Sequence, residues 1–214
     1  MLILLPPSEK KKAAASKKKF DLSSLVFAAE LSDIRGQATN KYDSPQTSPA
    51  IEIYDGVLFQ GLNWKTLSAS EQKQANSKVL IVSALFGLVK PLDQIFSYKE
   101  KIDNKLWREA VAQVALKYSD ELIIDCRSST YKGVWTINPQ NTIEVRVFKV
   151  NGAERSVITH MSKKYRGELT GHLLKQTADP TTAAEVQRIA AQLFECELHA
   201  PVDGQPWALD LLIS

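Results

Sequence analysis

The stretch LILLPPSEK, residues 2–10, decides the fold class of this chain. Four consecutive apolar residues stopped by Pro6 and Pro7 predict a short buried strand, because proline cannot continue the hydrogen-bond ladder of a sheet. Two later runs have the same form, KVLIVS at residues 78–83 and ELIIDC at residues 121–126. If the three strands lie parallel in one sheet, their carboxyl ends open on a shared crevice, where α/β proteins usually bind ligands.

Patterns elsewhere in the chain predict helices and hairpins around these strands. Asn151-Gly152 is a strong hairpin signal between strands at 142–150 and 154–160, because both residues accept the positive φ of a type I′ turn. Asp203-Gly204 suggests a second hairpin between 194–199 and 207–213. Helices are expected near 22–35, from 50 to 62, after Ser68 with Glu71 in a capping box, along 106–114, and at 162–176 and 182–193. The fold class is therefore mixed α/β (α+β), with a central mixed sheet in a single compact domain over residues 1–214.

The amino-acid composition excludes several classes of protein. The chain has 214 residues, of which 44% are hydrophobic and 24% charged, so it can bury a core and is not disordered. No apolar run approaches the roughly 20 residues of a membrane helix, and no basic segment precedes the apolar start as in a signal peptide. Two cysteines are too few for a disulfide framework. We expect a cytoplasmic protein with no membrane partner.

The charges are segregated along the chain, although the net charge is only +3. Residues 1–20 hold six lysines and one acid, residues 160–175 are also basic, and residues 179–214 are acidic. Such segregation can attract a polyanion to one face. The candidate DNA-binding residues are Lys10, Lys11, Lys12, Lys17, Lys18 and Lys19. A mobile, solvated loop over 11–19 is the alternative.

Polar residues follow each apolar run. Ser8, Ser83 and the pair Ser128-Ser129 stand at the expected strand ends, where their hydroxyls could bind phosphate, sugar or a base edge. Alternatively, each serine only caps the helix that follows its strand.

Two further segments suit an anionic ligand. The segment KKYRG at 163–167 offers two ammonium groups, a guanidinium fork and an aromatic ring; a charged helix face with Tyr165 packed inward is the other interpretation. The turn FGLVKPLD at 86–93 is bracketed by Lys90 and Asp93 but lacks the spaced glycines of a phosphate loop.

Metal chemistry has little support in the sequence. His160, His172 and His199 lack ligand spacing, and Cys126 at an apolar strand end is typical of inert packing. No metal and no cofactor are expected. Carboxylates such as Glu9, Asp93 and Asp125 leave a metal-handling protein as a third, less specific interpretation.

In combination these segments resemble one family. The opening LILLPPSEK, IYDGVLFQGL at 53–62, SALFGLVKPLD at 83–93 with Tyr98, LIIDCRSSTYKGVW at 122–135 and KKYRG at 163–167 occur in an order that resembles the YaaA-like (UPF0246) family of peroxide stress proteins. The resemblance covers nearly the whole chain. It implies a role in the oxidative stress response, with DNA binding or limitation of damage from free iron.

The resemblance also implies one cleft lined by residues of these segments. They are Tyr54, Gly56, Gly61, Ser83, Gly87, Lys90, Pro91, Asp93, Tyr98, Ser129, Tyr131, Lys164, Arg166 and Gly167.

Two functions follow from the residues. The first is a DNA-binding stress protein. The second is an enzyme acting on a nucleotide, nucleoside or base. The candidate catalytic residues are Asp93, Tyr98, Ser129 and Tyr131. The candidate anion- or nucleotide-binding residues are Ser8, Lys10, Ser83, Lys90, Lys164 and Arg166.

Overall fold

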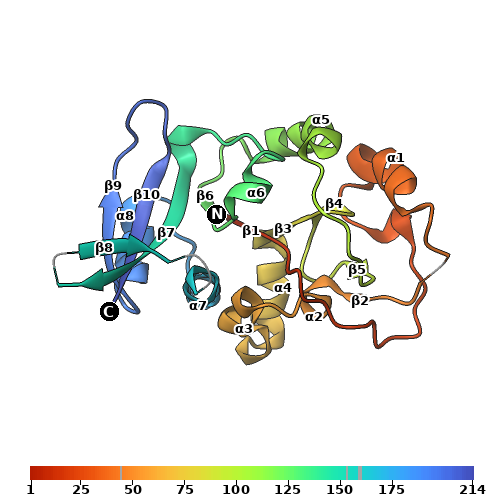
Figure 1. Cartoon of the computed structure of the whole chain (residues 1–214), viewed down its shortest axis with the longest axis horizontal. Coiled ribbons are helices and arrows are strands. Elements are labelled where there is room, and N and C mark those ends of the chain that lie inside the picture. Colours follow the sequence, from red (N-terminus) through yellow and green to blue (C-terminus); the bar gives the residue numbers. More distant parts are fainter. Residues whose placement is uncertain (44, 153, 159–160) are drawn as a thin grey trace.

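The computed structural model describes residues 1–43, 45–152, 154–158 and 161–214. Its main sheet has eight strands in the order β4-β3-β1-β6-β7-β10-β9, with β8 paired to β7 (Figure 1). The strands are β1 (Leu2–Leu5), β3 (Val79–Ser83), β4 (Gly87–Val89), β6 (Ile123–Asp125), β7 (Thr142–Asn151), β8 (Glu154–Val157), β9 (Glu195–His199) and β10 (Trp207–Ile213). A separate two-stranded ribbon pairs β2 (Ser48–Pro49) with β5 (Gln94–Ile95). The mixed α/β class is confirmed.

The three apolar runs form the centre of this sheet, as predicted. β1 lies between β3 and β6 and is parallel to both, and β6 is parallel to β7. All four residues of β1 are buried, since both faces of the sheet are covered by helices. Leu2 and Leu4 pack into one core cluster, whereas Ile3 and Leu5 pack into the other.

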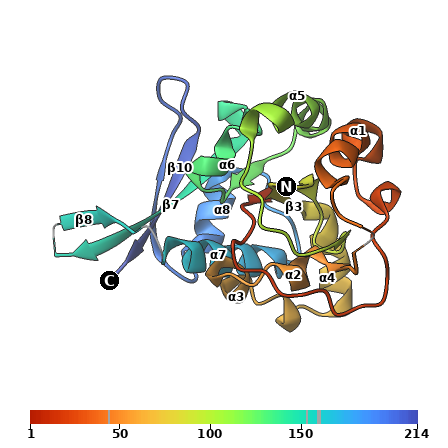
Figure 2. The same cartoon turned by 45° about the vertical axis from the view of Figure 1, so that its right-hand side comes forward.

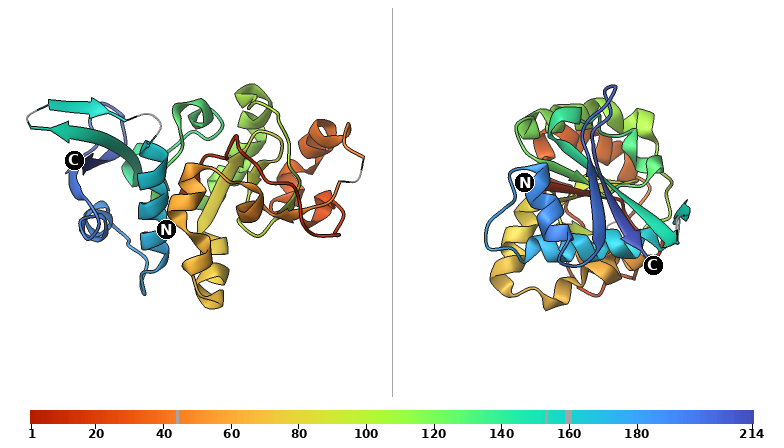
Figure 3. Two further views of the ribbon diagram at one scale, coloured as in Figure 1. Left: turned by 60° about the horizontal axis from the view of Figure 1, so that its bottom comes forward. Right: turned by 90° about the vertical axis from the view of Figure 1, so that its left-hand side faces the viewer.

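Helices cover the sheet on both faces. The helices are α1 (Ala28–Thr39), α2 (Ala50–Ile53), α3 (Val57–Leu62), α4 (Ala69–Lys78), α5 (Asn104–Ala115), α6 (Ser129–Lys132), α7 (Ser162–Leu174) and α8 (Ala183–Ala190). In Figure 1, α1, α5 and α6 lie above the sheet and α2, α3, α4 and α7 lie below it. The helices α3 and α7 run side by side in the left view of Figure 3. No helix of the described residues is long and apolar enough to cross a membrane.

Both hairpins form, but the turn geometry differs from the prediction at the first. Asn151 is the last residue of β7 and pairs with Glu154, and Gly152 has a positive φ of 61° whereas Asn151 does not. In the second, Asp203 and Gly204 both have positive φ, of 51° and 75°. The β7–β8 hairpin extends away from the body in Figure 2. Thr159 and His160, expected at the end of its second strand, lie outside the described residues.

Two helix predictions need correction. The single helix expected from 50 to 62 is broken, because Tyr54 and Gly56 have extended backbone conformations that end α2 and begin α3. The helix expected near 22–35 begins only at Ala28, after a short 3-10 turn at Leu22–Ser24. The capping boxes at Ser68 and Thr182 form as predicted.

Candidate functional site

The carboxyl ends of β1, β3 and β6 open at the same edge of the sheet, because the three strands are adjacent and parallel. Ser83 is the last residue of β3 and is fully buried, and Ser8 lies three residues after β1 and is 8% exposed. Ser128 precedes α6 as its cap residue, yet its side chain makes no capping hydrogen bond. The strand ends therefore bring Ser8 and Ser83 to the same edge.

A chain of buried hydroxyl groups lies at this edge. The Tyr54 and Tyr98 hydroxyls are 2.9 Å apart, and the Tyr98 hydroxyl is 2.8 Å from the Ser83 hydroxyl. The Phe86 backbone N–H donates to Ser83 Oγ at 3.1 Å. Burial raises the pKa of Tyr54 to about 12 and raises the pKa of Tyr98 well above its ordinary value. Both phenols are therefore protonated at neutral pH and serve as hydrogen-bonding groups.

Lys11 covers this hydroxyl chain. Its Nζ is 4.1 Å from the centroid of the Tyr98 ring and 5.8 Å from that of the Tyr54 ring. Burial lowers the pKa of the Lys11 amine, while the charges of Glu100 and Glu9 oppose that shift. A half-buried amine on aromatic faces is not a solvated loop residue.

The backbone holds the start of the lysine-rich segment in place. Lys11 forms an isolated β-bridge with Tyr54, the Lys12 N–H donates to the Ile53 carbonyl at 2.8 Å, and the Asp55 N–H donates to the Lys10 carbonyl at 3.0 Å. The C-terminal end of the lysine-rich segment is also held in place, by an isolated β-bridge between Lys19 and Gln46. The segment is a loop between these two bridges, as expected, and backbone pairing holds it at both ends.

Four other lysines of the segment have different surroundings. The Lys10 and Lys12 amines pair with the Asp55 carboxylate, at 2.9 and 3.2 Å. Lys17 and Lys18 are exposed. Five of the six lysines that the sequence groups together thus have three different environments.

Two adjoining cavities lie beside the strand ends. One, of about 350 Å³, is lined by Ser8 and Lys10 from one side and by Lys163 of α7 from another. The second, of about 610 Å³, runs along α2 and α3 as far as Trp64. Asp55, Phe59 and Gln60 line both cavities, so the two lie side by side. Their sizes are those of small-molecule sites.

The KKYRG segment forms the first turns of α7. Lys164 pairs with Glu168 at 3.5 Å, and the Tyr165 ring packs edge-on against Phe194, which favours the interpretation in which the aromatic faces inward. Arg166 Nη1 donates to the Arg127 carbonyl at 3.4 Å, beside the end of β6, and no partner for its buried Nε is found among the described residues. Arg166 therefore keeps hydrogen-bonding capacity next to the strand ends.

Lys90 and Asp93 close a turn after the edge strand β4. Asp93 Oδ2 accepts hydrogen bonds from the backbone N–H groups of Lys90 and Val26, at 2.9 and 3.3 Å. Burial raises the pKa of Asp93. These contacts give Asp93 a structural role in the turn.

Ser129 and Tyr131 begin α6, on the other side of the strand ends. Ser129 is exposed, and Tyr131 is half-buried. Burial raises the pKa of Tyr131, and the Glu9 charge raises it further, which places Glu9 and Tyr131 within electrostatic range of each other.

Two buried arginines escaped the sequence analysis. Arg127 donates Nε–H and Nη2–H groups to the two Asp125 oxygens at 2.9 and 2.8 Å, and both side chains are buried. Arg35 donates to three backbone carbonyls. The spacing of Leu31, Arg35 and Thr39 by four residues was the available signal, since all three lie on the buried face of α1.

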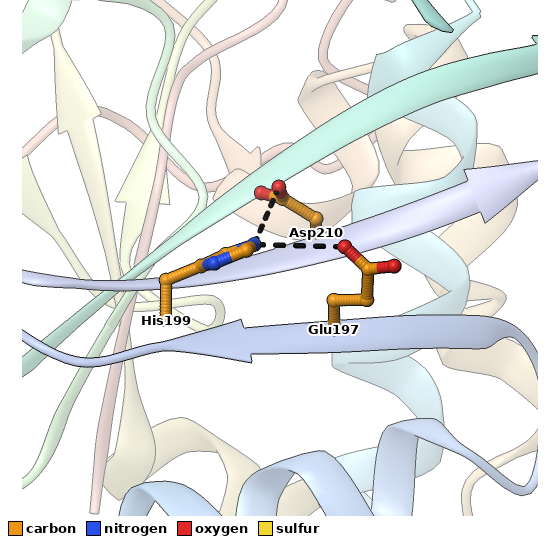
Figure 4. A group of neighbouring side chains, drawn as sticks. All are labelled: Glu197, His199 and Asp210. Atoms are coloured by element: carbon orange, nitrogen blue, oxygen red, sulfur yellow. Dashed lines mark hydrogen bonds and ion pairs between the residues drawn. The ribbon is translucent and has the colours of Figure 1, made fainter. Parts of the chain in front are cut away.

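Among the described residues, one cluster of side chains could in principle bind a metal ion. It consists of Glu197 and His199 on β9 and Asp210 on β10 (Figure 4). His199 Nε2 lies 3.0 Å from Asp210 Oδ2 and 3.8 Å from Glu197 Oε2. Arg146 binds both Asp210 oxygens at 2.5 and 2.8 Å, and Arg155 binds both Glu197 oxygens at 2.6 Å. The two arginines balance the two carboxylates, so a cation would have to displace an arginine. The group is an ion-pair network.

The Cys126 side chain, directly after β6, is fully buried. This burial raises the pKa of its thiol to about 12. Its thiol is therefore not a nucleophile.

Comparison with known proteins gives a consistent result. The profile of the family described as peroxide stress protein YaaA matches residues 14–198. A UPF0246 protein of Streptomyces coelicolor is 32% identical over 180 residues, covering 77% of this chain and 68% of that protein. A UPF0246 protein of Corynebacterium efficiens is 34% identical over 232 residues, covering 89% and 91%. The chain belongs to the YaaA family of peroxide stress proteins.

Proposed function

We propose that this protein serves the peroxide stress response by binding DNA along the cavities beside the strand ends. The observation that carries the proposal is the convergence of the two basic segments. Lys10 of the first segment and Lys163 of the second line the same cavity. Lys12 and Lys65 line the adjoining one. Lysines spaced along a groove are suited to the regularly spaced phosphates of a nucleic acid.

Acidic residues in the same groove limit the charge there. Asp55 is neutralised by Lys10 and Lys12, while Glu9 and Glu52 also line the cavities. Exposed Lys17 and Lys18 add positive charge further along the tied segment. Binding should therefore be electrostatic and strongly dependent on salt.

The single substitutions Lys10→Gln and Lys163→Gln should each weaken DNA binding. For every phosphate that a variant no longer neutralises, the slope of log affinity against log salt concentration should fall by about 0.9. Fluorescence anisotropy of a labelled duplex over a range of salt concentrations measures both quantities. Lys105→Gln on α5, an exposed lysine on the opposite face of the sheet, is the matched control and should change neither. Equal slopes for all three variants would contradict the proposed surface.

The contribution of the lysine-rich segment to DNA binding is best measured by substitution. Deleting residues 11–19 would also remove Lys11 and its contact with the Tyr98 ring. The double variant Lys17→Gln/Lys18→Gln should weaken duplex binding and leave the melting temperature unchanged, since both side chains are exposed. Unchanged affinity would exclude these two lysines from the DNA contact.

A second candidate function is an enzyme that acts on a nucleotide, nucleoside or base in the same crevice. It is favoured by the buried Tyr54–Tyr98–Ser83 hydroxyl chain and by Arg166 Nε, which has no hydrogen-bond partner among the described residues. A surface that only binds DNA needs neither.

This second function predicts that nucleotides raise the melting temperature and that Arg166→Ala abolishes the rise. Thermal shift with a panel of nucleotides, nucleosides and bases measures it. Arg155→Ala, at an exposed ion pair on β8, is the control and should retain the shift. A shift that survives in Arg166→Ala would rule out Arg166 as a ligand contact.

A further inference from the structure

Aromatic rings line the larger of the two cavities beside the strand ends, the one of about 610 Å³ along α2 and α3. The Tyr54 and Phe59 rings are stacked there, with centroids 5.3 Å apart and ring planes at 25°. Both of these residues are buried, whereas Trp64 packs against the same core cluster and is only half-buried. Trp64 therefore presents aromatic surface to the cavity, which suits a planar ligand.

The turn after α3 fixes the position of Trp64. Asn63 ends α3 in the left-handed conformation, with a φ of 51°, and the chain continues as a 3-10 turn over Trp64–Thr66. The Trp64 carbonyl accepts hydrogen bonds from the Leu67 N–H at 3.1 Å and from the Gln72 side chain at 3.4 Å. These bonds hold the backbone of the turn, so the aromatic side chain is positioned before a ligand arrives.

Polar side chains with unused hydrogen-bonding groups surround this aromatic surface. Glu52, Gln60 and Asn63 line the same cavity, and within the described ranges none of their side chains makes a hydrogen bond or an ion pair. Each amide offers a donor and an acceptor, and the carboxylate can accept from an amino group. The edge of a nucleobase displays donors and acceptors together, so this set of side chains matches it.

Lysines at the same cavity supply positive charge for a phosphate. Lys65 follows Trp64 in the turn, and its amine has no carboxylate partner among the residues that the structure describes. Lys12 also lines the cavity and pairs with Asp55 at 3.2 Å. Aromatic surface flanked by ammonium groups is the arrangement with which proteins bind the bases and phosphates of unpaired nucleic acid.

We propose that the larger cavity binds an unpaired nucleobase, stacked on Trp64, with the phosphate of the same nucleotide near Lys65. The inference rests on the proposed DNA binding and names the form of nucleic acid that this cavity takes. A base within a duplex is covered on both faces by its neighbours, so only a base outside the stack can lie on the Trp64 ring. Single-stranded DNA and free nucleotides share this chemistry, and titration with each separates them.

Tryptophan fluorescence tests the proposal. Of the four tryptophans, Trp107 and Trp135 are buried, and the half-buried Trp207 lines neither cavity. A single-stranded oligonucleotide should quench the emission by stacking on Trp64, and the duplex of the same sequence should quench far less. Trp64→Phe should abolish the quenching, whereas Trp207→Phe, the matched control, should retain it. Undiminished quenching in the Trp64→Phe protein would overturn the proposal.

Affinities for a labelled single strand measure the contribution of each side chain. Trp64→Ala should weaken binding about 5- to 150-fold, the range for loss of one base–aromatic contact, and Trp64→Phe should restore most of the affinity. Asn63→Gly removes only the amide, because glycine accepts the left-handed backbone, and should weaken binding about 2- to 10-fold without lowering Tm. If Trp64→Ala does not fold, Asn63→Gly decides, and unchanged single-strand affinity in that variant would contradict the proposal.

Two kinds of ligand identify the source of the base. Deoxynucleoside monophosphates that quench Trp64 on their own would show that a free nucleotide is sufficient, and quenching by the single strand alone would show that the site needs the strand. Either result supports the cavity as a base site. Absence of Trp64-dependent quenching by both ligands refutes it.

Failure of this inference can be told apart from failure of the proposed function. Duplex binding in the anisotropy experiment without quenching of Trp64 by any ligand would refute the base site and leave the proposed DNA binding intact. Quenching of Trp64 by nucleotides in a protein that binds no DNA would support the base site and refute the proposed DNA binding.

Discussion

Replacing Asp125 with alanine is expected to lower the free energy of unfolding by about 3–5 kcal/mol. The Asp125 and Arg127 side chains are only 2% and 1% exposed, and two hydrogen bonds join them. Removing the carboxylate leaves the Arg127 guanidinium buried without a counter-charge. The remaining bonds of Arg127 Nη1, to the carbonyls of Tyr131 and Trp135 at 3.3 Å, cannot replace it.

Thermal and urea unfolding would measure this loss, which corresponds to about 2–4 °C in Tm for each kcal/mol in a chain of this size. Glu197→Ala is the control, because its partner Arg155 is 44% exposed and such surface pairs contribute only about 0–1 kcal/mol. The double variant Asp125→Ala/Arg127→Met should recover part of the stability, since it removes the unpaired charge. A loss below about 1 kcal/mol in Asp125→Ala would contradict the charge-burial argument.

Replacing Gly167 with alanine should destabilise the protein by about 3 kcal/mol, the upper end of the usual cost of overpacking. Gly167 lies where α7 packs against α3, and an added Cβ would overlap with the Leu58 carbonyl oxygen and lie 2.8 Å from the Leu62 nitrogen. Both are backbone atoms, so no side-chain rotation relieves the clash and the helices must separate. Because α7 also carries Lys163, DNA affinity should fall together with stability.

The measurement combines denaturant unfolding with DNA anisotropy. Gly36→Ala provides the matched control. Gly36 lies in α1 with no atom within 4 Å of an added Cβ, so alanine there should raise stability by about 0.5–1 kcal/mol through helix propensity. Equal stability of the Gly167→Ala protein and the unmodified protein would contradict this prediction. It would show that the α3–α7 interface accommodates an added Cβ without cost.

The centre of the fold could be predicted from the sequence, because it depends on local patterns of residues. Continuous apolar runs predicted β1, β3 and β6, and the capping boxes at Ser68 and Thr182 marked helix starts that the structure confirms. The burial of Arg35 had only one local signal, its four-residue spacing from Leu31 and Thr39. Its acceptors are the carbonyls of Val26, Phe86 and Leu88, and two of these lie about fifty residues away along the chain.

The candidate site was predictable only in outline. Of the candidate anion-binding residues, Ser8 and Lys10 line one cavity of the described structure, and from the second basic segment Lys163 lines it rather than the candidates Lys164 and Arg166. The sequence could not distinguish Lys11 from Lys10 and Lys12. In extended backbone, successive side chains point to opposite sides, and only the pairing with Tyr54 decides which lysine faces the rings.

The central position of β1 has a consequence for how the protein folds during synthesis. β1 leaves the ribosome before both of its neighbours, which begin at Val79 and Ile123. At about 5–20 residues per second, Leu2–Leu5 waits roughly 4–15 s for its first partner strand. During that interval the apolar segment is free to bind chaperones, and the centre of the sheet closes only after Ile123–Asp125 has been translated.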